Sequence, residues 1–159
     1  MMRKPTASPH PVPKVGEGKR GAAGRLGYLL RQASHAWRQR MDRAFVGLGV
    51  TPPQFLVLTM IANYPGLSGA DLARLTFLTP QTVSVIVANL VRGGAIVRRR
   101  HNIHGRIQHL DLTPSGRALL ARSRARAHAI ERTLLAGLSA GEERTIRAWL
   151  VRVALADAA

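Results

Sequence analysis

Cysteine is missing from this 159-residue chain, and acidic residues are scarce. Without cysteine, disulfides and thiolate chemistry are excluded. The 8 Asp and Glu residues are scattered, and no two of them stand at a spacing that suits acid–base catalysis. A serine-centred nucleophile motif and a phosphate-binding glycine loop are also missing. The sequence therefore predicts a protein that is not an enzyme.

Long hydrophobic runs are absent as well. No apolar stretch is long enough to span a bilayer, and none follows the basic pair Arg3 and Lys4 as it would in a signal peptide. We therefore expect a cytoplasmic protein without a membrane partner. The histidines His101, His104 and His109 fall close together, but zinc needs several converging ligands, usually including Cys, Asp or Glu. We expect neither a metal nor a cofactor.

Positive charge is what the chain has in excess. Lys and Arg number 24, and the formal net charge is +16. Solubility alone requires a net charge of only about 2 to 8 in magnitude. A charge this large attracts polyanions, of which nucleic acid is the commonest. An anionic membrane surface is the weaker alternative, because the charges spread over several predicted helices instead of one amphipathic stripe with aromatic anchors.

Proline separates a tail from the rest of the chain. Residues 1–23 are basic and rich in proline and glycine, and Pro5, Pro9, Pro11 and Pro13 remove helix donors. We expect this segment to be a disordered tail and residues 24–159 to form one domain.

Apolar spacing and capping residues predict the elements of that domain. Helices are expected over 25–48, 52–64, a short stretch after Ser68, 80–92, 114–136 and 140–155. Strands are expected over 95–100 and 107–112, joined as a hairpin. The fold class is therefore mainly α with a small β-hairpin wing (α+β). Within the short third helix, Leu72 and Leu75 are expected to face inward.

Residues 50–113 are predicted to form, in order, a helix, a short helix, a tight turn, another helix and a hairpin. In this order the helix after the turn can lie in the major groove of double-stranded DNA, with its first residues at the base edges. The candidates for contact in these helices are Ser68, Thr79, Gln81, Thr82, Ser84 and Asn89. For any single one of these residues, a solvated helix end is the simpler interpretation, so the hypothesis depends on the whole arrangement.

The hairpin carries a cluster of basic residues, namely Arg98, Arg99, Arg100, His104 and Arg106. Like charges repel one another unless an anion lies near them. A basic ribbon of this size can straddle a phosphate backbone and insert an arginine into the minor groove. The alternative is a solvated basic edge strand that prevents aggregation. The helix-turn-helix pattern just before the hairpin favours DNA.

Five motifs in order and at the right spacing resemble the MarR family of winged helix-turn-helix proteins. They are 48-LGVTPPQF-55, 67-LSGADLA-73, 78-LTPQTVS-84, 94-GAIVRR-99 and 112-LTPSG-116. The resemblance implies a winged helix over 50–113 and dimerisation helices over 24–48 and 114–159. It also implies a homodimeric, ligand-responsive repressor that binds a pseudo-palindromic operator. A non-specific architectural DNA-binding protein is the alternative, and the polar residues after Thr79 argue against it.

The resemblance also implies a small-molecule effector, and at one position of the wing this chain departs from the family's pattern. Family members bind a small aromatic or anionic ligand beside the dimer helices, and the candidates here are His35, Trp37, Arg38 and Tyr64. Packing is the simpler role for each of these residues taken alone. The family usually has Asp-x-Arg in the wing, where this chain has His104 and Arg106. A histidine at that position predicts DNA binding that is sensitive to pH near neutrality.

Overall fold

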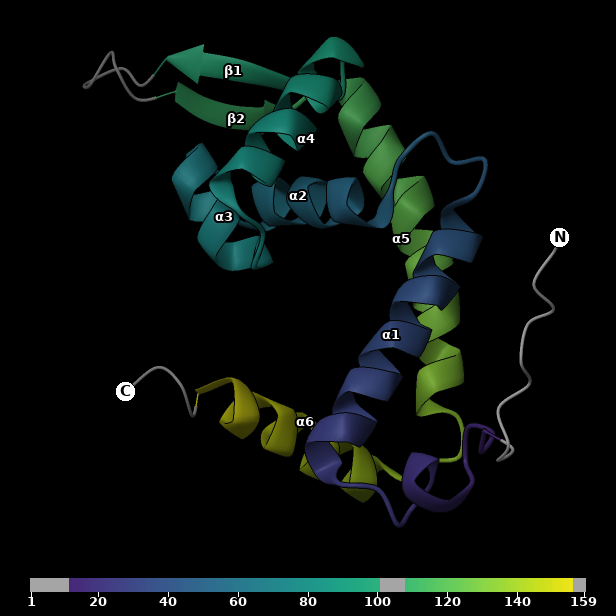
Figure 1. Ribbon diagram of the computed structural model, residues 1–159. Coiled ribbons are helices and arrows are strands. Elements are labelled where there is room, and N and C mark those ends of the chain that lie inside the picture. The colour runs from purple at the N-terminus through teal and green to yellow at the C-terminus, as the bar shows by residue number, and fades with distance from the viewer. Residues whose placement is uncertain (1–11, 101–107, 156–159) are drawn as a thin grey trace, which may run out of the picture. The chain divides into compact units, whose positions relative to one another are not determined.

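The computed structural model describes residues 12–100 and 108–155, which fall into two units divided after Arg40, inside helix α1 (Leu26–Phe45). In the first unit a 3-10 turn, η1 (Gly18–Arg20), precedes α1 (Figure 1). The Arg20 guanidinium donates from Nη1 to the Pro13 carbonyl (2.8 Å), and Gln32 of α1 donates to the Arg20 carbonyl (3.1 Å). These bonds hold part of the predicted tail against α1.

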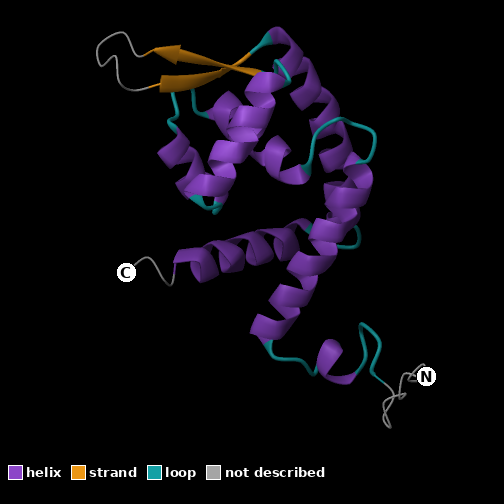
Figure 2. Cartoon of the chain, turned by 45° about the horizontal axis from the view of Figure 1, so that its top comes forward, coloured by secondary structure: helices purple, strands orange, loops and turns teal. Residues whose placement is uncertain are grey.

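The second unit contains the remaining elements. They are α2 (Pro52–Asn63), α3 (Gly69–Thr76), α4 (Pro80–Arg92), β1 (Ile96–Arg100), β2 (Gln108–Leu112), α5 (Pro114–Leu135) and α6 (Ala140–Leu155). Figure 2 shows the strands as a twisted ribbon that projects from the helices. The predicted fold class, mainly α with a hairpin wing, is confirmed. The first helix ends at Phe45, earlier than the predicted 48, because Gly47 already takes a positive φ of 79°.

Side-chain caps fix where the helices begin. Thr51, Thr79 and Thr113 each precede a proline, and each accepts a hydrogen bond from a backbone N–H in the first turn. Proline lacks the N–H that would be unpaired at this position, so the pair of residues suits a helix start. Ser139 and Glu142 form the predicted reciprocal capping box of α6.

The core of the second unit lies between α2, α3 and α4 and continues under the hairpin. Leu58 and Leu72 are fully buried, and the α4 stripe predicted from the sequence is buried too, at Val83, Ile86, Val87 and Leu90. The expectation for Leu75 was wrong, because this side chain is exposed. Helix α3 turns Leu72, Ala73 and Thr76 inward instead. The Thr76 hydroxyl donates to the Leu72 carbonyl (2.6 Å), so its burial leaves no polar group unpaired.

The 112-LTPSG-116 motif fastens the base of the hairpin to α5. The Thr113 hydroxyl donates to the Gly94 carbonyl (2.7 Å), and Ser115 donates to the same oxygen (2.8 Å). The Thr113 amide donates to the Ala95 carbonyl (3.0 Å). Gly116 is buried directly against Ala95, where a larger residue would not fit. The strands therefore leave the helical body in a fixed direction.

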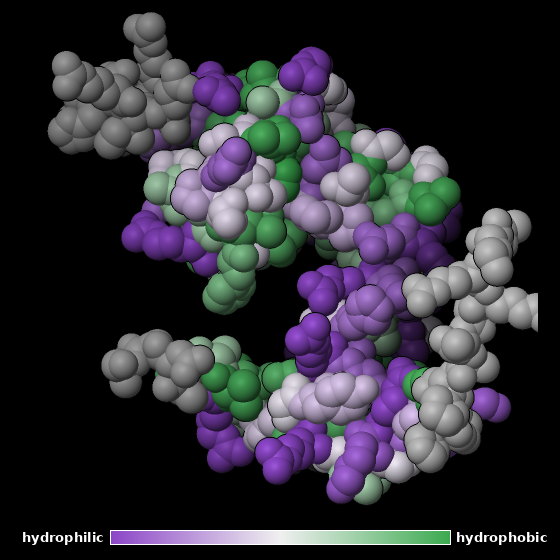
Figure 3. Space-filling model, viewed as in Figure 1, coloured by the Kyte–Doolittle hydropathy of each residue, from purple (hydrophilic) through white to green (hydrophobic). Residues whose placement is uncertain are grey.

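The last helix, α6, presents apolar side chains to solvent. Ile146, Leu150 and Val153 lie along one side of it, and each is about 40% exposed. Figure 3 shows hydrophobic side chains gathered over this helix. In the described part of the chain no helix is both long enough and apolar enough to cross a membrane.

Candidate nucleic-acid interface

The first turn of α4 presents three polar side chains to solvent. Gln81, Thr82 and Ser84 are exposed, while Val83 between them is buried and anchors the helix. The Ser84 hydroxyl donates to the Pro80 carbonyl (2.9 Å) and keeps its lone pairs for a further partner. The Gln81 amide carries both donors and an acceptor. This turn therefore has the hydrogen-bonding groups that base edges require.

Thr79 and Ser68, which are also predicted contacts, lie at the N-caps of α4 and α3. Thr79 Oγ1 accepts from the Thr82 amide (3.1 Å) and lies 2.8 Å from Thr82 Oγ1. Ser68 Oγ donates to Asp71 (2.6 Å) and accepts from the Asp71 amide (3.2 Å). Hydrogen bonds from Ser68, followed by that from Arg74, lower the pKa of Asp71 to about 2. Both hydroxyls thus orient the helix ends where backbone N–H groups attract anions.

A second exposed row continues along α4 from Gln81. Asn89 lies two turns farther on and accepts a hydrogen bond from Arg92 (3.4 Å). Between them Val85 is 57% exposed on the same side of the helix. Val85 is not among the contacts predicted from the sequence. Its offset from the buried stripe at Val83 and Ile86 was the signal that could have identified it.

Strand alternation sends the wing arginines to opposite faces of the hairpin. Arg98 pairs with Leu110 and Arg99 with His109 in the antiparallel register. Arg99 Nε lies 2.9 Å from a carboxylate oxygen of Asp111 on the neighbouring strand. Arg100 follows in β1, opposite Gln108. Arg99 is therefore neutralised within the hairpin, and Arg98 and Arg99 lie on opposite faces of it.

The structure brings Ser84 of α4 and Arg98 of β1 together. Both line a small pocket of about 170 Å³ whose floor includes Val87 and Leu110. The polar turn and the hairpin therefore form one continuous surface. The other predicted wing residues, His104 and Arg106, lie outside the described residues.

The predicted effector residues are divided between the two units. His35, Trp37 and Arg38 lie on α1, where His35 Nε2 is 2.9 Å from the Gln39 amide nitrogen and Trp37 is half-buried. Tyr64 follows the last residue of α2 and is 52% exposed. Among residues 12–100 and 108–155, no three His, Cys, Asp or Glu side chains lie where they could hold a metal ion.

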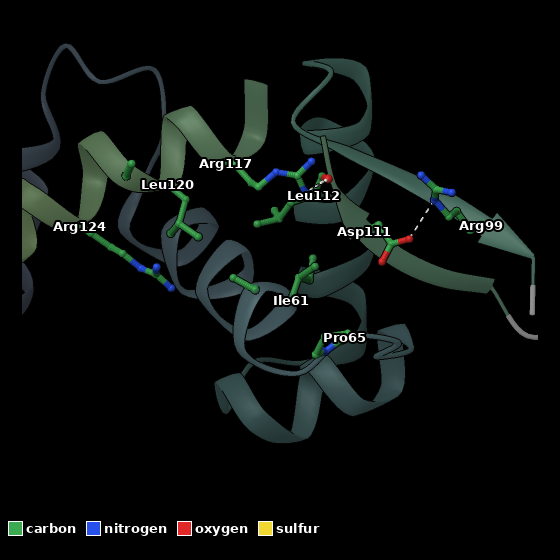
Figure 4. Close-up of a pocket in the computed structure, with 10 residues that line it drawn as sticks. Ile61, Pro65, Arg99, Asp111, Leu112, Arg117, Leu120 and Arg124 are labelled. Carbon is green, nitrogen blue, oxygen red and sulfur yellow. Dashed lines mark hydrogen bonds and ion pairs between the residues drawn. The ribbon is translucent and has the colours of Figure 1, made fainter. Parts of the chain in front are cut away.

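A larger pocket, of about 490 Å³, lies on the hairpin face that carries Arg99 (Figure 4). The end of α2, both strands and the start of α5 contribute its ten lining residues: Ile61, Ala62, Pro65, Arg99, Asp111, Leu112, Arg117, Leu120, Ala121 and Arg124. None of the four predicted effector residues is among them. The sequence alone does not reveal this pocket, because its walls come from segments up to about sixty residues apart.

Comparison with known proteins tests the resemblance. The MarR family model matches residues 48–107. The HTH-type transcriptional repressor Rv2887 of Mycobacterium tuberculosis is 36% identical to this chain over 128 residues, which make up 80% of this chain and 92% of the relative. The chain belongs to the MarR family.

Solved structures agree with this assignment to the MarR family. A probable transcriptional regulator from Pseudomonas aeruginosa superposes with a TM-score of 0.72 at 32% identity, covering 81% of this chain and 96% of that one. Rv2887 in complex with DNA superposes with a TM-score of 0.66 at 33% identity, covering 82% of this chain and 98% of that one. Rv2887 in complex with salicylic acid superposes with a TM-score of 0.67 at 35% identity, covering 82% of this chain and 96% of that one. The MarR winged helix expected from the five motifs is thus confirmed.

Proposed function

We propose that this MarR-family chain is a homodimeric repressor of transcription that binds a pseudo-palindromic operator and responds to a small aromatic or anionic effector. The observation that carries the proposal is the surface shared by the polar first turn of α4 and the basic hairpin. The described side chains of these two features offer hydrogen-bonding groups and positive charge, which suit the binding of DNA.

In the proposed complex with DNA, different residues contact the bases and the phosphate backbone. Gln81, Thr82 and Ser84 face base edges in the major groove, and the exposed Val85 offers a methyl surface to thymine. Ser68 and Thr79 set the helix ends toward phosphates, and Asn89 lies farther along α4. The basic residues of the hairpin, Arg98, Arg99, Arg100, His104 and Arg106, contact the backbone and the minor groove. A relative, Rv2887, has been solved in complex with DNA, which supports the DNA-binding role.

The exposed apolar side of α6 supports the proposed dimer. Ile146, Leu150 and Val153 lose contact with water only if another surface covers them. Burial of such side chains stabilises an association by about 25 cal/mol per Å² of apolar area. A second copy of this chain provides two α4 helices for the two half-sites of an operator.

The effector belongs to the class that relatives bind. Rv2887 has been crystallised with salicylic acid. His35, Trp37, Arg38 and Tyr64 provide aromatic and cationic groups for such a ligand, and they remain the candidates that the sequence predicts.

Competition binding at fixed salt tests the DNA assignment. Gln81→Ala should relax base preference at one position of each half-site, by about 1–3 kcal/mol. Arg106→Ala should weaken binding to specific and random duplexes alike and reduce the salt slope by about one. Gln39→Ala on α1 is the matched control and should leave both measurements unchanged. A specificity ratio near one for the unaltered protein would instead support the architectural alternative.

A further inference from the structure

The N-terminal turn, residues 12–25, holds basic residues that no part of the proposed function uses. All three lysines of the protein, Lys4, Lys14 and Lys19, lie among its first nineteen residues, and every Lys or Arg after them is an arginine. Over residues 12–40, seven Lys and Arg residues accompany a single acidic residue, Glu17. The first unit therefore has an excess of positive charge of its own, separate from that of α4 and the hairpin.

Hydrogen bonds fold the N-terminal turn and fasten it to α1. The Gly16 amide donates to the Arg20 carbonyl (3.1 Å). A Cβ on Gly21 would overlap the Gly16 carbonyl oxygen, so the turn closes in this way only with glycine at position 21. Arg20 and Gln32 exchange two hydrogen bonds, one from Arg20 Nε (3.3 Å) and one from the Gln32 amide (3.1 Å). The basic residues of the turn are therefore carried on a folded segment.

The exposed cations of the N-terminal turn have no carboxylate partner. Lys14, Lys19 and Arg25 are exposed. The carboxylate of Glu17 accepts a hydrogen bond from the backbone N–H of Lys14 (2.8 Å). Within residues 12–100 and 108–155, the ion pairs between side chains all lie after residue 70, so none involves these three cations. Like charges on one short folded segment repel one another, and a bound polyanion relieves that repulsion.

We propose that the N-terminal turn is a second DNA-binding surface, which contacts the phosphate backbone through Lys14, Lys19 and Arg25 and reads no sequence. The inference rests on the proposed function, because a chain bound to DNA through α4 meets a high local concentration of phosphates. A lysine ammonium binds phosphate as a point charge, which suits contacts that do not depend on the bases. Because the turn is folded before it binds, it loses less conformational entropy than a flexible tail would.

The composition of the N-terminal turn favours double-stranded DNA over other polyanions. Attachment to an anionic membrane surface needs aromatic or large apolar anchors beside the basic residues. The turn contains no Phe, Trp or Tyr, and its largest apolar residues are Val12 and Val15. Single-stranded nucleic acids are held by aromatic side chains on which bases stack, and these are missing too. The phosphate backbone of a duplex is the partner that positive charge alone can bind.

Fluorescence anisotropy with a random-sequence duplex, at about 50 to 200 mM salt, tests the proposal, because the slope of log K against log salt counts the neutralised phosphates. Lys14→Gln combined with Lys19→Gln should weaken binding and lower this slope by about two for each protomer in contact. Lys14→Arg combined with Lys19→Arg keeps both charges and should bind as the unaltered protein does. Arg144→Gln combined with Arg152→Gln removes two exposed charges from α6, away from its apolar side, and should leave the slope unchanged.

Chemical acetylation gives a second test that needs no substitution. It neutralises the three lysines and the terminal amine but leaves every arginine charged, including those of the hairpin. The acetylated protein should lose at least as much of the salt slope as the double glutamine variant. Reductive methylation keeps the charge of lysine, so the methylated protein should retain the full slope.

Three results would overturn the proposal. The first is an unchanged slope in both the glutamine variant and the acetylated protein. The second is an equal fall in the α6 control, which would mean that net charge alone matters. The third is binding to anionic phospholipid vesicles that depends on the lysines, while the slope for DNA does not. If the unaltered protein binds no duplex at all, the proposed function fails as well. If it binds a duplex with a slope that ignores the lysines, only this inference fails.

Discussion

Replacing Gly116 with alanine should separate the hairpin from α5. A Cβ at this position would lie 1.9 Å from the Ala95 carbonyl oxygen and 2.8 Å from its carbon. Ordinary contact needs about 3.4 Å or more, so the backbone must move by more than 1 Å. Overpacking of this kind costs about 1–3 kcal/mol. The movement also weakens the bonds from Thr113 to Gly94 and Ala95, each worth about 1 kcal/mol.

We therefore expect Gly116→Ala to lower the free energy of unfolding by roughly 2–4 kcal/mol, after about 1 kcal/mol of helix propensity is regained. Denaturant unfolding at one protomer concentration measures this, because the stability of a dimer depends on concentration. Gly141→Ala is the matched control. Its nearest side-chain atoms lie 3.9 Å away in the exposed first turn of α6, so it should be neutral or slightly stabilising. A Gly116→Ala protein as stable as the unaltered chain would refute the reasoning.

Two further substitutions probe the turn and the cap of the helix-turn-helix. Phe77 has a φ of 55° and is 93% exposed, so Phe77→Gly should relieve left-handed strain without losing packing and raise the free energy of unfolding by roughly 0.5–1 kcal/mol; an unchanged or lower unfolding midpoint would contradict this. The pKa of Asp71 is lowered in the folded state, so its contribution to stability is present above pH 4 and should disappear as pH falls toward about 2. Asp71→Asn should flatten that part of the profile of stability against pH, and parallel profiles for the two proteins would count against the cap.

Local chemistry made the helix starts predictable. A threonine before a proline satisfies the first N–H groups of a helix with its own side chain, whatever the rest of the chain does. Thr51, Thr79 and Thr113 therefore act as the sequence predicts. The buried stripe of α4 was equally predictable, because its apolar residues recur in the sequence with the helical period of 3.6 residues.

Features that depend on register or on tertiary packing were not predictable. Leu75 has the spacing of a core residue, but α3 is short and turns the polar Thr76 inward once the Leu72 carbonyl accepts its hydroxyl. The pairing of Arg99 with Asp111 depends on which residues of the two strands stand opposite each other. Local sequence does not fix that register, nor does it bring Arg117 and Arg124 to the end of α2.

Selection of bound duplexes from a random-sequence pool by the purified full chain tests whether the protein reads DNA sequence as a dimer. We expect enrichment of an inverted repeat whose half-sites lie about 10 base pairs apart, centre to centre, as two α4 helices of a dimer require. A pool that stays random while the protein binds it, or a single half-site without a repeat, would contradict sequence-specific recognition by a dimer.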